Sequence, residues 1–271
     1  MHPFFHIFSF TIPAYGIVIL IGCTLGLLLA LWRCERKNLS RQHTLHTFLF
    51  GVIGLMVGAK LLYIITNIGK IWEYRSVLTE DPAAFFAFIF SGGFVFYGGL
   101  IGAIIMVYIY CRAFKIPFLK SMDLFSPTVA LAHSVGRIGC FLAGCCYGIH
   151  TEGPLGVTFH DSPVAPNGIS LFPVQLLESG LNAILCVALL LYARKHRPPG
   201  RVIGLYLIIY AVERFCLEFL RFDYIRGFIL GVSTSQIISI LLLPIGLYLM
   251  LRKSREEVSA VDPLETQEVS Q

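Results

Sequence analysis

Arg137 lies in a stretch whose residue types could hold a phosphate group. The stretch, residues 136–148, contains this arginine, four glycines and three cysteines at one end of a long apolar segment. A guanidinium at the centre of a membrane costs roughly 2.5–3.5 kcal/mol on insertion scales, so it needs a compensating partner. Glycines allow a ligand or another backbone to approach closely. These residue types predict an anion site, with phosphate as the expected anion.

A second set of polar residues recurs at helical spacing near residues 202–220. Its members fall at i, i+4, i+8 and i+11, so they share one helix face: Tyr210, Arg214, Glu218 and Arg221. One interpretation is a buried structural ion pair between Arg214 and Glu218. The other, the default for ionisable residues within a membrane, is a polar surface that lines a cavity for an ionic group. Arg137 and Arg214 with one nearby carboxylate favour an anionic ligand such as a phospholipid headgroup.

Three cysteines follow Arg137 closely: Cys140, Cys145 and Cys146. They could be small packing residues, a disulfide on an oxidising side of the membrane, or a nucleophile, and we favour packing. The eight cysteines of the chain show no paired CxxC units, which are typical of a metal site. His133, one helical turn before Arg137, is interpreted as a packing histidine. We therefore expect no metal and no cofactor.

The composition indicates a membrane protein. Of 271 residues, 56% are hydrophobic and 14% are charged, which lies far outside the range of a soluble domain. The net charge of +5 does not indicate a nucleic-acid partner, because lysine and arginine collect in the cytoplasmic loops of membrane proteins. We expect membrane lipids as partners and no nucleic acid. The first residues lack a basic segment, so a cleavable signal peptide is not expected.

Apolar segments separated by polar loops predict an all-α, seven-transmembrane-helix bundle. They cover about residues 14–31, 46–65, 91–110, 123 into the 136–148 stretch, 173–192, 202–220 and 235–251. The aromatic segment 1–13 is expected to lie on the membrane surface. The glycine-rich run 91–102 indicates close approach of backbones rather than an ordinary helix. The polar residues 147–172 predict an external loop or small cap.

The distribution of basic residues predicts the orientation. Most of the 21 lysine and arginine residues lie after the first and third spans, between the fifth and sixth, and after the seventh. Because basic residues collect on the cytoplasmic side, we expect the N-terminus outside, the C-terminus in the cytoplasm and the cap in the periplasm. Residues 1–255 are expected to form a single transmembrane bundle domain. Residues 256–271 are expected to be a disordered cytoplasmic tail.

Several motifs occur together in a known order, and the chain resembles the prolipoprotein diacylglyceryl transferases of bacterial inner membranes. The matching segments span about residues 12–255 and are Tyr15-Gly16, Gly98-Gly99-Leu100-Ile101-Gly102, Gly136-Arg137-Ile138-Gly139 with Gly144 and Gly148, Pro173-Val174-Gln175-Leu176-Leu177-Glu178, and residues 210–221. The resemblance implies a multi-pass enzyme that moves the diacylglyceryl group of phosphatidylglycerol onto the thiol of a lipobox cysteine in a prelipoprotein and releases glycerol phosphate. Phosphatidylglycerol and prelipoprotein signal peptides are the implied partners.

The resemblance also implies roles for individual residues. Arg137 would bind the phosphatidylglycerol headgroup, and Arg214 would act at the reacting centre with Glu218 orienting it. These roles suit the chemistry, since the leaving phosphate must be stabilised by donors already in place and the attacking thiol must lose its proton. Three further residues would line the site: Tyr15, Gly148 and Tyr210.

The sequence departs from the family pattern at three positions. Tyr97 stands where the family has a histidine before its Gly-Gly-Leu-Ile-Gly run, and Cys140 and Cys145 replace an asparagine and an acidic residue. An ordinary tyrosine, with a pKa of about 10, is a weaker proton acceptor near pH 7 than a histidine. Three explanations are open. The catalytic base is Tyr97, influenced by Arg214, or it is His133. Alternatively, the family's histidine is not essential to the chemistry.

Two alternatives to this activity stay open. One is a lipid-modifying transferase of the same fold with a different acceptor, which the changes at Tyr97, Cys140 and Cys145 motivate. The other is a membrane protein that binds or transports lipid without chemistry. The sequence shows no internal repeat, which counts against transport.

Overall fold

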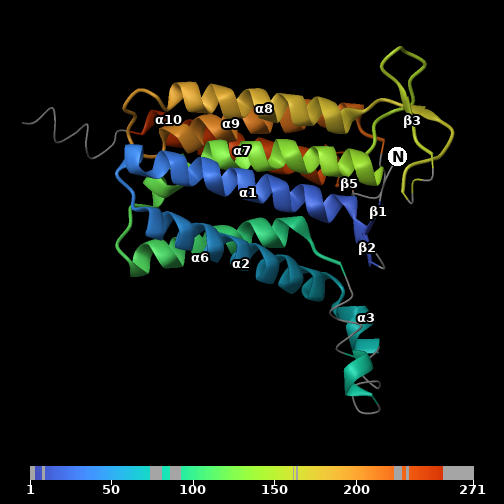
Figure 1. The fold of residues 1–271 in the computed structure, drawn as a ribbon, viewed down its shortest axis with the longest axis horizontal. Helices are drawn as coiled ribbons and strands as arrows, with labels where there is room; N and C mark the ends of the chain where they lie inside the picture. Colours follow the sequence, from blue (N-terminus) through green and yellow to red (C-terminus); the bar gives the residue numbers. More distant parts are fainter. Residues whose placement is uncertain are drawn as a thin grey trace, which may run out of the picture. The chain divides into compact units, whose positions relative to one another are not determined.

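In the computed structural model, the described residues are 4–7, 10–73, 81–85, 93–160, 162, 164–222, 228–229 and 232–252. They are mostly helical, as predicted (Figure 1). They form two compact units, Met1–Arg33 with Met122–Gln271, and Cys34–Ser121. The single domain over 1–255 stays a prediction, and the predicted tail, 256–271, lies outside the described residues.

Small residues allow the helices of the first unit to pack closely. Gly22 of α1 faces α7, since a Cβ there would lie 3.1 Å from the carbonyl oxygen of Ala132. Gly204 of α9 faces α10 in the same way, 3.0 Å from the carbonyl oxygen of Gly246. Such contacts favour helix association in membranes. The long helices of this unit are α1 (Ala14–Cys34), α7 (Phe118–Ala143), α8 (Val174–Tyr192), α9 (Arg201–Leu217) and α10 (Thr234–Leu251).

The second unit is centred on two helices whose glycines meet. Gly58 contacts the carbonyl oxygen of Gly98, and Gly54 contacts that of Gly102. The predicted close approach of backbones is confirmed. The expected departure from ordinary helix was wrong for Gly98 and Gly102, because they lie within a regular helix and its neighbour fills the space beside them. The elements are η1 (Glu35–Lys37), α2 (Arg41–Thr66), α3 (Ile68–Glu73) and α6 (Phe96–Ala113).

Short antiparallel hairpins belong to the first unit, at the end where α7 and α9 finish and α8 and α10 begin (Figure 1). The first occupies the segment that was expected to lie on the membrane surface. The second lies within the predicted cap, where Phe159, Leu171 and Phe141 pack together. The hairpins are β1 (Phe4–Ile7) with β2 (Phe10–Pro13), β3 (Val157–Thr158) with β4 (Ser170–Leu171), and β5 (Phe228–Ile229) with β6 (Val232–Ser233).

The apolar helices show that this is a multi-pass membrane protein. In the described ranges, α1, α2, α6, α8 and α10 are long and apolar enough to cross a membrane. The helices α7 and α9, which carry Arg137 and Arg214, are not among these five. A helix lies at each of the seven predicted spans, but the number of spans and their orientation stay predictions.

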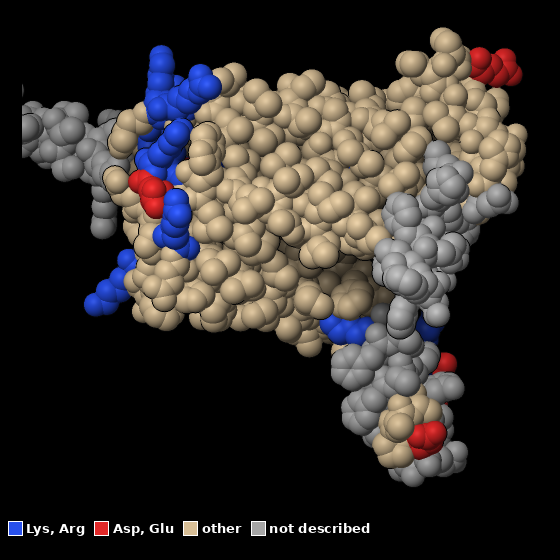
Figure 2. All heavy atoms as spheres, viewed as in Figure 1, with Lys and Arg blue, Asp and Glu red and all other residues tan. Residues whose placement is uncertain are grey.

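In the view of Figure 2, exposed lysine and arginine side chains of the first unit gather at the end away from the hairpins. Figure 2 shows lysine and arginine side chains at the end of this unit where α8 finishes and α9 begins. Arg194, Lys195 and Arg197 follow α8 directly. Over the middle of the helices, the described surface in this view consists of other residue types. The unit is therefore apolar along its length and basic at one end.

Asp123 of α7 caps the start of α9 at this basic end. Its carboxylate oxygens accept hydrogen bonds from the backbone N–H groups of Gly200, at 2.7 Å, and Ile203, at 2.8 Å. The N-cap residue of α9 is Gly200, which has no side chain of its own to accept these bonds. A contact between residues far apart in the sequence thus replaces a local cap.

Asp123→Ala is expected to lower the free energy of unfolding by about 1–3 kcal/mol, because it leaves buried N–H groups without acceptors. Thermal denaturation of the purified protein in detergent measures the loss. Glu152→Ala, which removes an exposed carboxylate, serves as the control and should melt like the wild type. Equal melting temperatures for both variants would contradict the capping role.

Candidate functional site

The helices α7, α8 and α9 bring charged residues together at the end of the first unit where the hairpins lie (Figure 1). Ser134 and Ser179 hold α7 against α8, because each hydroxyl donates to the carbonyl oxygen of the other residue at 2.8 Å. Arg137 and Glu178 lie within one turn of these serines. The paired serines therefore hold Arg137 and Glu178 at a fixed separation.

Glu178 is a buried carboxylate that three basic side chains approach. Arg137 Nη2 lies 2.6 Å from its Oε2, His133 Nε2 lies 3.3 Å from its Oε1, and Arg221 Nη1 lies 3.9 Å from its Oε2. The Arg137 contact is a buried ion pair. Removing such partners would leave an uncompensated buried charge. The sequence marks Glu178 as an acid within an apolar span but does not predict its partners.

Arg214 pairs with Glu218, as the helical spacing predicts. Its Nη2 lies 2.8 Å from Glu218 Oε2 and also donates to Ser235 Oγ at 2.8 Å. Glu218 begins the short 3-10 helix η2 (Glu218–Leu220), directly after α9. Because Ser235 belongs to α10, the guanidinium of Arg214 is held by two elements.

Two guanidinium nitrogens of the site, one on Arg137 and one on Arg214, are available to a ligand. Within the described residues, Arg137 Nε and Arg214 Nη1 are buried and have no hydrogen-bond partner. A buried donor in this state costs roughly 1–3 kcal/mol, which an anion that accepts from it would recover. Glu178 lies against Arg137 in addition to Glu218 beside Arg214, but Arg221 also approaches Glu178, so these groups keep the excess of one positive charge that the sequence predicts.

Tyr210 and Tyr15, both predicted to line the site, belong to the same unit. Tyr210 stacks on Tyr206 with 5.7 Å between ring centroids, and its ring lies 5.6 Å from that of His133. Tyr15 lies against α7, since a Cβ on Gly139 would be 3.3 Å from its ring. Its side chain is partly exposed. The lining roles of both tyrosines stay predictions.

Gly148 joins three segments after α7. Its N–H donates to the carbonyl oxygen of Phe172 at 3.2 Å, and the N–H of Ile149 donates to that of Leu220 at 3.0 Å. A Cβ on Gly148 would collide with the Phe172 oxygen and lie 2.9 Å from the Leu220 oxygen. Close backbone approach therefore requires glycine here. Its predicted role in lining the site stays a prediction.

Gly148→Ala is expected to destabilise the protein by about 1–3 kcal/mol, because the added methyl group has to displace backbone atoms. The melting temperature in detergent measures the effect. Gly153→Ala is a matched control in the same loop, since its Cβ would meet only the Thr151 hydroxyl at 3.4 Å. A Gly148→Ala protein as stable as this control would contradict the packing argument.

Comparison with known proteins identifies the family. The family model for prolipoprotein diacylglyceryl transferase matches residues 2–252. The chain belongs to the prolipoprotein diacylglyceryl transferase family. It is 42% identical to the phosphatidylglycerol–prolipoprotein diacylglyceryl transferase of Clostridium tetani, over 90% of this chain and 94% of that protein. It is 38% identical to phosphatidylglycerol–prolipoprotein diacylglyceryl transferase 2 of Clostridium perfringens, over 90% of this chain and 91% of that protein. It is 31% identical to the corresponding transferase of Finegoldia magna, over 94% of this chain and 97% of that protein. The resemblance inferred from the motifs is thus confirmed.

Tyr97 occupies the position of the family's histidine. It is the second residue of α6, in the unit Cys34–Ser121, and its ring centroid lies 5.9 Å from that of Phe96. The arginines of the site belong to the other unit. The catalytic role of Tyr97 therefore stays a prediction.

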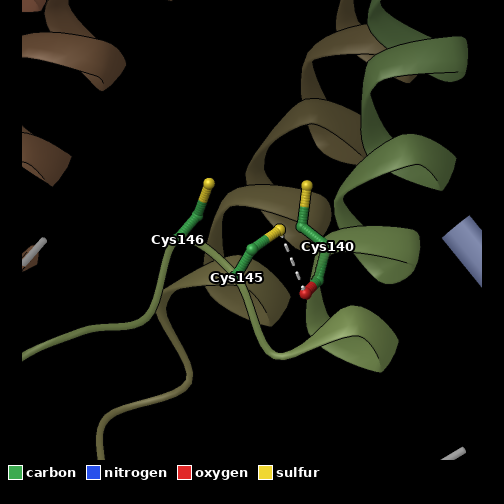
Figure 3. A group of neighbouring side chains, drawn as sticks. All are labelled: Cys140, Cys145 and Cys146. Carbon is green, nitrogen blue, oxygen red and sulfur yellow. Dashed lines mark hydrogen bonds between the residues drawn. The ribbon is translucent and has the colours of Figure 1, made fainter. Parts of the chain in front are cut away.

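The other two departures from the family pattern, Cys140 and Cys145, lie together with Cys146 (Figure 3). The three sulfur atoms lie within 4.8 Å of one another, and none of the three residues forms a disulfide with another described cysteine. Cys145 Sγ donates to Cys140 O at 3.6 Å, and Arg137 Nη1 donates to Cys140 Sγ at 3.8 Å. A hydrogen bond with the Cys140 thiol, together with the guanidinium groups of Arg221 and Arg137, lowers the pKa of the Cys146 thiol despite its burial. The cysteines therefore form a polar cluster beside Arg137 as well as packing.

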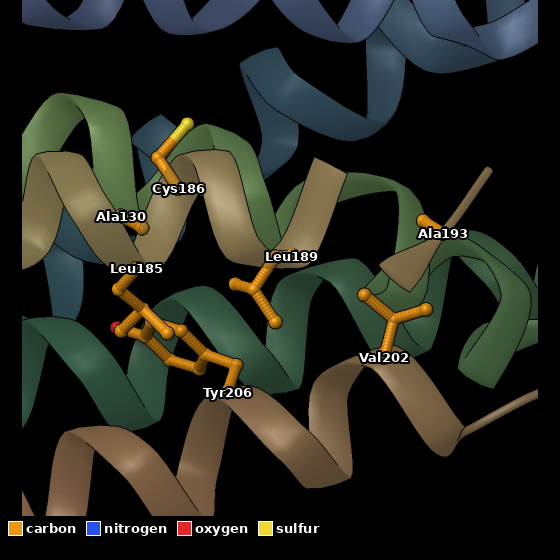
Figure 4. Packing of buried hydrophobic residues seen from close by; sticks show 7 residues of the cluster. All are labelled: Ala130, Leu185, Cys186, Leu189, Ala193, Val202 and Tyr206. Carbon is orange, nitrogen blue, oxygen red and sulfur yellow. The ribbon is translucent and has the colours of Figure 1, made fainter. Parts of the chain in front are cut away.

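An apolar cluster fixes the spacing of the helices that carry the site. It occupies the halves of α8 and α9 away from Glu178 and Arg214. Close packing of this kind resists changes in helix separation, so the buried ion pairs keep their geometry. The cluster consists of Ala130, Leu185, Cys186, Leu189, Ala193, Val202 and Tyr206 (Figure 4).

Proposed function

We propose that the protein transfers the diacylglyceryl group of phosphatidylglycerol to the thiol of a lipobox cysteine in a prelipoprotein, in the bacterial inner membrane. The observation that carries this proposal is that, in the described residues, Arg137 and Arg214 of the site each have a buried donor without a hydrogen-bond partner, Arg137 Nε and Arg214 Nη1. Such donors suit a phosphate group in a site with little water. Family membership supports the same reaction.

The reaction forms a carbon–sulfur bond and breaks a carbon–oxygen bond. The lipobox thiol loses its proton to a base and attacks the glyceryl carbon that bears the phosphate. The electron pair of the broken bond leaves with the oxygen of glycerol phosphate. Negative charge therefore grows on the leaving phosphate, and a guanidinium already held in place stabilises it without reorganisation.

Each site residue has a proposed role. Arg137 binds the phosphatidylglycerol headgroup, whose phosphate takes over part of the contact now made with Glu178. Arg214 stabilises the leaving phosphate, and Glu218 orients it through their ion pair. Tyr97 is proposed as the proton acceptor. The remaining residues line the site: Tyr15, Gly148 and Tyr210.

The proposed arrangement has seven spans in a single bundle over 1–255, with the N-terminus outside and a cytoplasmic tail at 256–271. The long helices that coincide with the predicted spans support this number. The basic end of the first unit, with Arg194, Lys195 and Arg197 (Figure 2), supports its placement in the cytoplasm. Arg137 and Arg214 then face the outer leaflet, and the small cap lies in the periplasm.

The test uses purified protein in vesicles of phosphatidylglycerol with a synthetic peptide that carries a lipobox cysteine. Mass spectrometry should detect a diacylglyceryl thioether on the peptide. A peptide with serine in place of the cysteine, and vesicles of phosphatidylethanolamine alone, should give none. Absence of product under conditions where the Clostridium tetani relative is active would overturn the proposal.

A second candidate is transfer of the same group to a different acceptor. The replacements at Tyr97, Cys140 and Cys145 favour it, because they change the polar groups near the expected site of thiol attack. A new lipid product that forms in vesicles without any peptide, and that is absent with an Arg214→Lys protein, would support this candidate over the first.

A further inference from the structure

Three thiols converge where α7 ends and the following loop begins (Figure 3). Cys140 lies in the last turn of α7, and Cys145 and Cys146 lie in the loop. Their sulfur atoms lie within 4.8 Å of one another. A zinc ion bound to thiolates at about 2.3 Å in tetrahedral geometry would set sulfur–sulfur distances of about 3.8 Å. The thiols therefore lie within about 1 Å of a metal-binding arrangement.

The loop is held in this conformation by contacts of its own. The Cys145 carbonyl accepts a hydrogen bond from Gln175 Nε2 of α8 at 2.8 Å, and the Cys145 N–H donates to Cys140 O at 3.1 Å. Gly144 has φ +68°, in the left-handed region that favours glycine. Because these contacts do not use the sulfur atoms, the thiols are brought together by the surrounding structure.

The surroundings supply the charge that a thiolate cluster needs. Arg137 Nη1 contacts Cys140 Sγ at 3.8 Å. Arg221, which lies 3.9 Å from Glu178, also acts electrostatically on Cys146. Thiolates are the form of cysteine that binds metals, and nearby guanidinium groups favour them. Sulfur ligands select soft ions such as Zn²⁺ and Cu⁺ over magnesium or calcium.

We propose that Cys140, Cys145 and Cys146 form a binding site for one soft metal ion such as Zn²⁺. Binding replaces the protons of the thiols by three metal–sulfur bonds, and those protons are released to solvent. The sulfur oxidation state does not change, so no oxidant or reductant is required. Zinc with three thiolates carries one net negative charge, which faces Arg137 and Arg221.

Metal binding has a consequence for lipid binding that rests on the proposed function. The guanidinium of Arg137 is close both to Cys140 Sγ and to Glu178 Oε2. A metal–thiolate group would hold this guanidinium more strongly than neutral thiols do. The phosphatidylglycerol phosphate would then compete with it for Arg137. Zinc is therefore expected to inhibit the transferase at this position.

The binding test uses reduced, metal-free, full-length protein in detergent and Zn²⁺ alone. Equilibrium dialysis should give one zinc per chain, with affinity at least tenfold lower in Cys140→Ser, Cys145→Ser and Cys146→Ser. Cys216→Ser, which changes an exposed cysteine, should bind like the wild type. With Co²⁺ as a second probe, wild-type protein should show sulfur-to-cobalt charge-transfer absorption. Wild-type protein that binds no zinc, or serine variants that all bind equally well, would overturn the site.

The activity test separates this proposal from the proposed function. Zinc should raise the phosphatidylglycerol concentration needed for half-maximal rate at least tenfold, and a chelator should restore it. If zinc binds but the rate is unaffected, the competition for Arg137 is wrong. If metal-free protein transfers no lipid at all, the proposed function fails, while the zinc-binding result is unchanged.

Discussion

Arg214→Lys is expected to reduce the rate of diacylglyceryl transfer by at least about 100-fold, because loss of one preorganised donor to a developing anion typically costs 10²–10³ in kcat. The lysine keeps a positive charge and can reach Glu218. It cannot reproduce the planar guanidinium, which contacts Glu218 and Ser235 through Nη2 and leaves Nη1 for the ligand. The loss should therefore come from geometry and not from charge.

The measurement is the initial rate of peptide modification in phosphatidylglycerol vesicles, at several lipid concentrations. For Arg214→Lys, kcat should fall while the lipid dependence changes little. The matched control is Arg194→Lys, which alters an exposed arginine at the basic end of the first unit. A rate for Arg214→Lys within threefold of this control would show that Arg214 does not act on the reacting phosphate.

Glu178→Gln is expected to destabilise the protein by about 3–5 kcal/mol, because it removes the charge from a buried ion pair and leaves the guanidinium groups uncompensated. Three basic side chains lie around this carboxylate, from Arg137, His133 and Arg221. Glutamine has nearly the same shape, so packing around it should be preserved. The loss should appear in thermal denaturation of the purified protein.

Phosphatidylglycerol should partly rescue the Glu178→Gln protein, because its phosphate can supply the missing negative charge beside Arg137. In mixed micelles, this lipid should raise the melting temperature of the variant more than that of the wild type. Phosphatidylethanolamine provides the comparison lipid, since its ammonium group offsets the phosphate charge. Equal effects of the two lipids on the variant would contradict a headgroup site at Arg137.

The positions of the helices and the pairing of Arg214 with Glu218 could be predicted because both follow from local periodicity in the sequence. The Arg214–Glu218 pair spans i, i+4 on one helix, so spacing alone reveals it. The pairing of Glu178 with Arg137 joins residues on α7 and α8 and has no such signal. Asp123 likewise meets Gly200 far along the chain. These contacts depend on how helices pack, which periodicity does not encode.

The cysteine cluster shows a different limit of sequence reasoning. Paired CxxC units mark many metal sites, and their absence led to the expectation of no metal. Here Cys140 ends a helix, and a left-handed Gly144 returns the chain so that Cys145 and Cys146 lie beside it. The spacing Cys-x4-Cys-Cys contains the signal, but it becomes informative only once the helix end and the turn are known.

The composition of α9 constrains how the protein enters the membrane during synthesis. This helix has 17 residues and carries two charged residues, Glu213 and Arg214, near its end, and charged residues within a span oppose insertion into the bilayer. The following helix, α10, is strongly apolar, and Gly246 lies against Gly204 of α9. Under the proposed seven-span arrangement, α9 therefore enters the bilayer together with α10 as a helical hairpin. Arg214 and Glu218 then reach their final depth only after the chain beyond residue 251 has been synthesised, so the reacting centre is completed last.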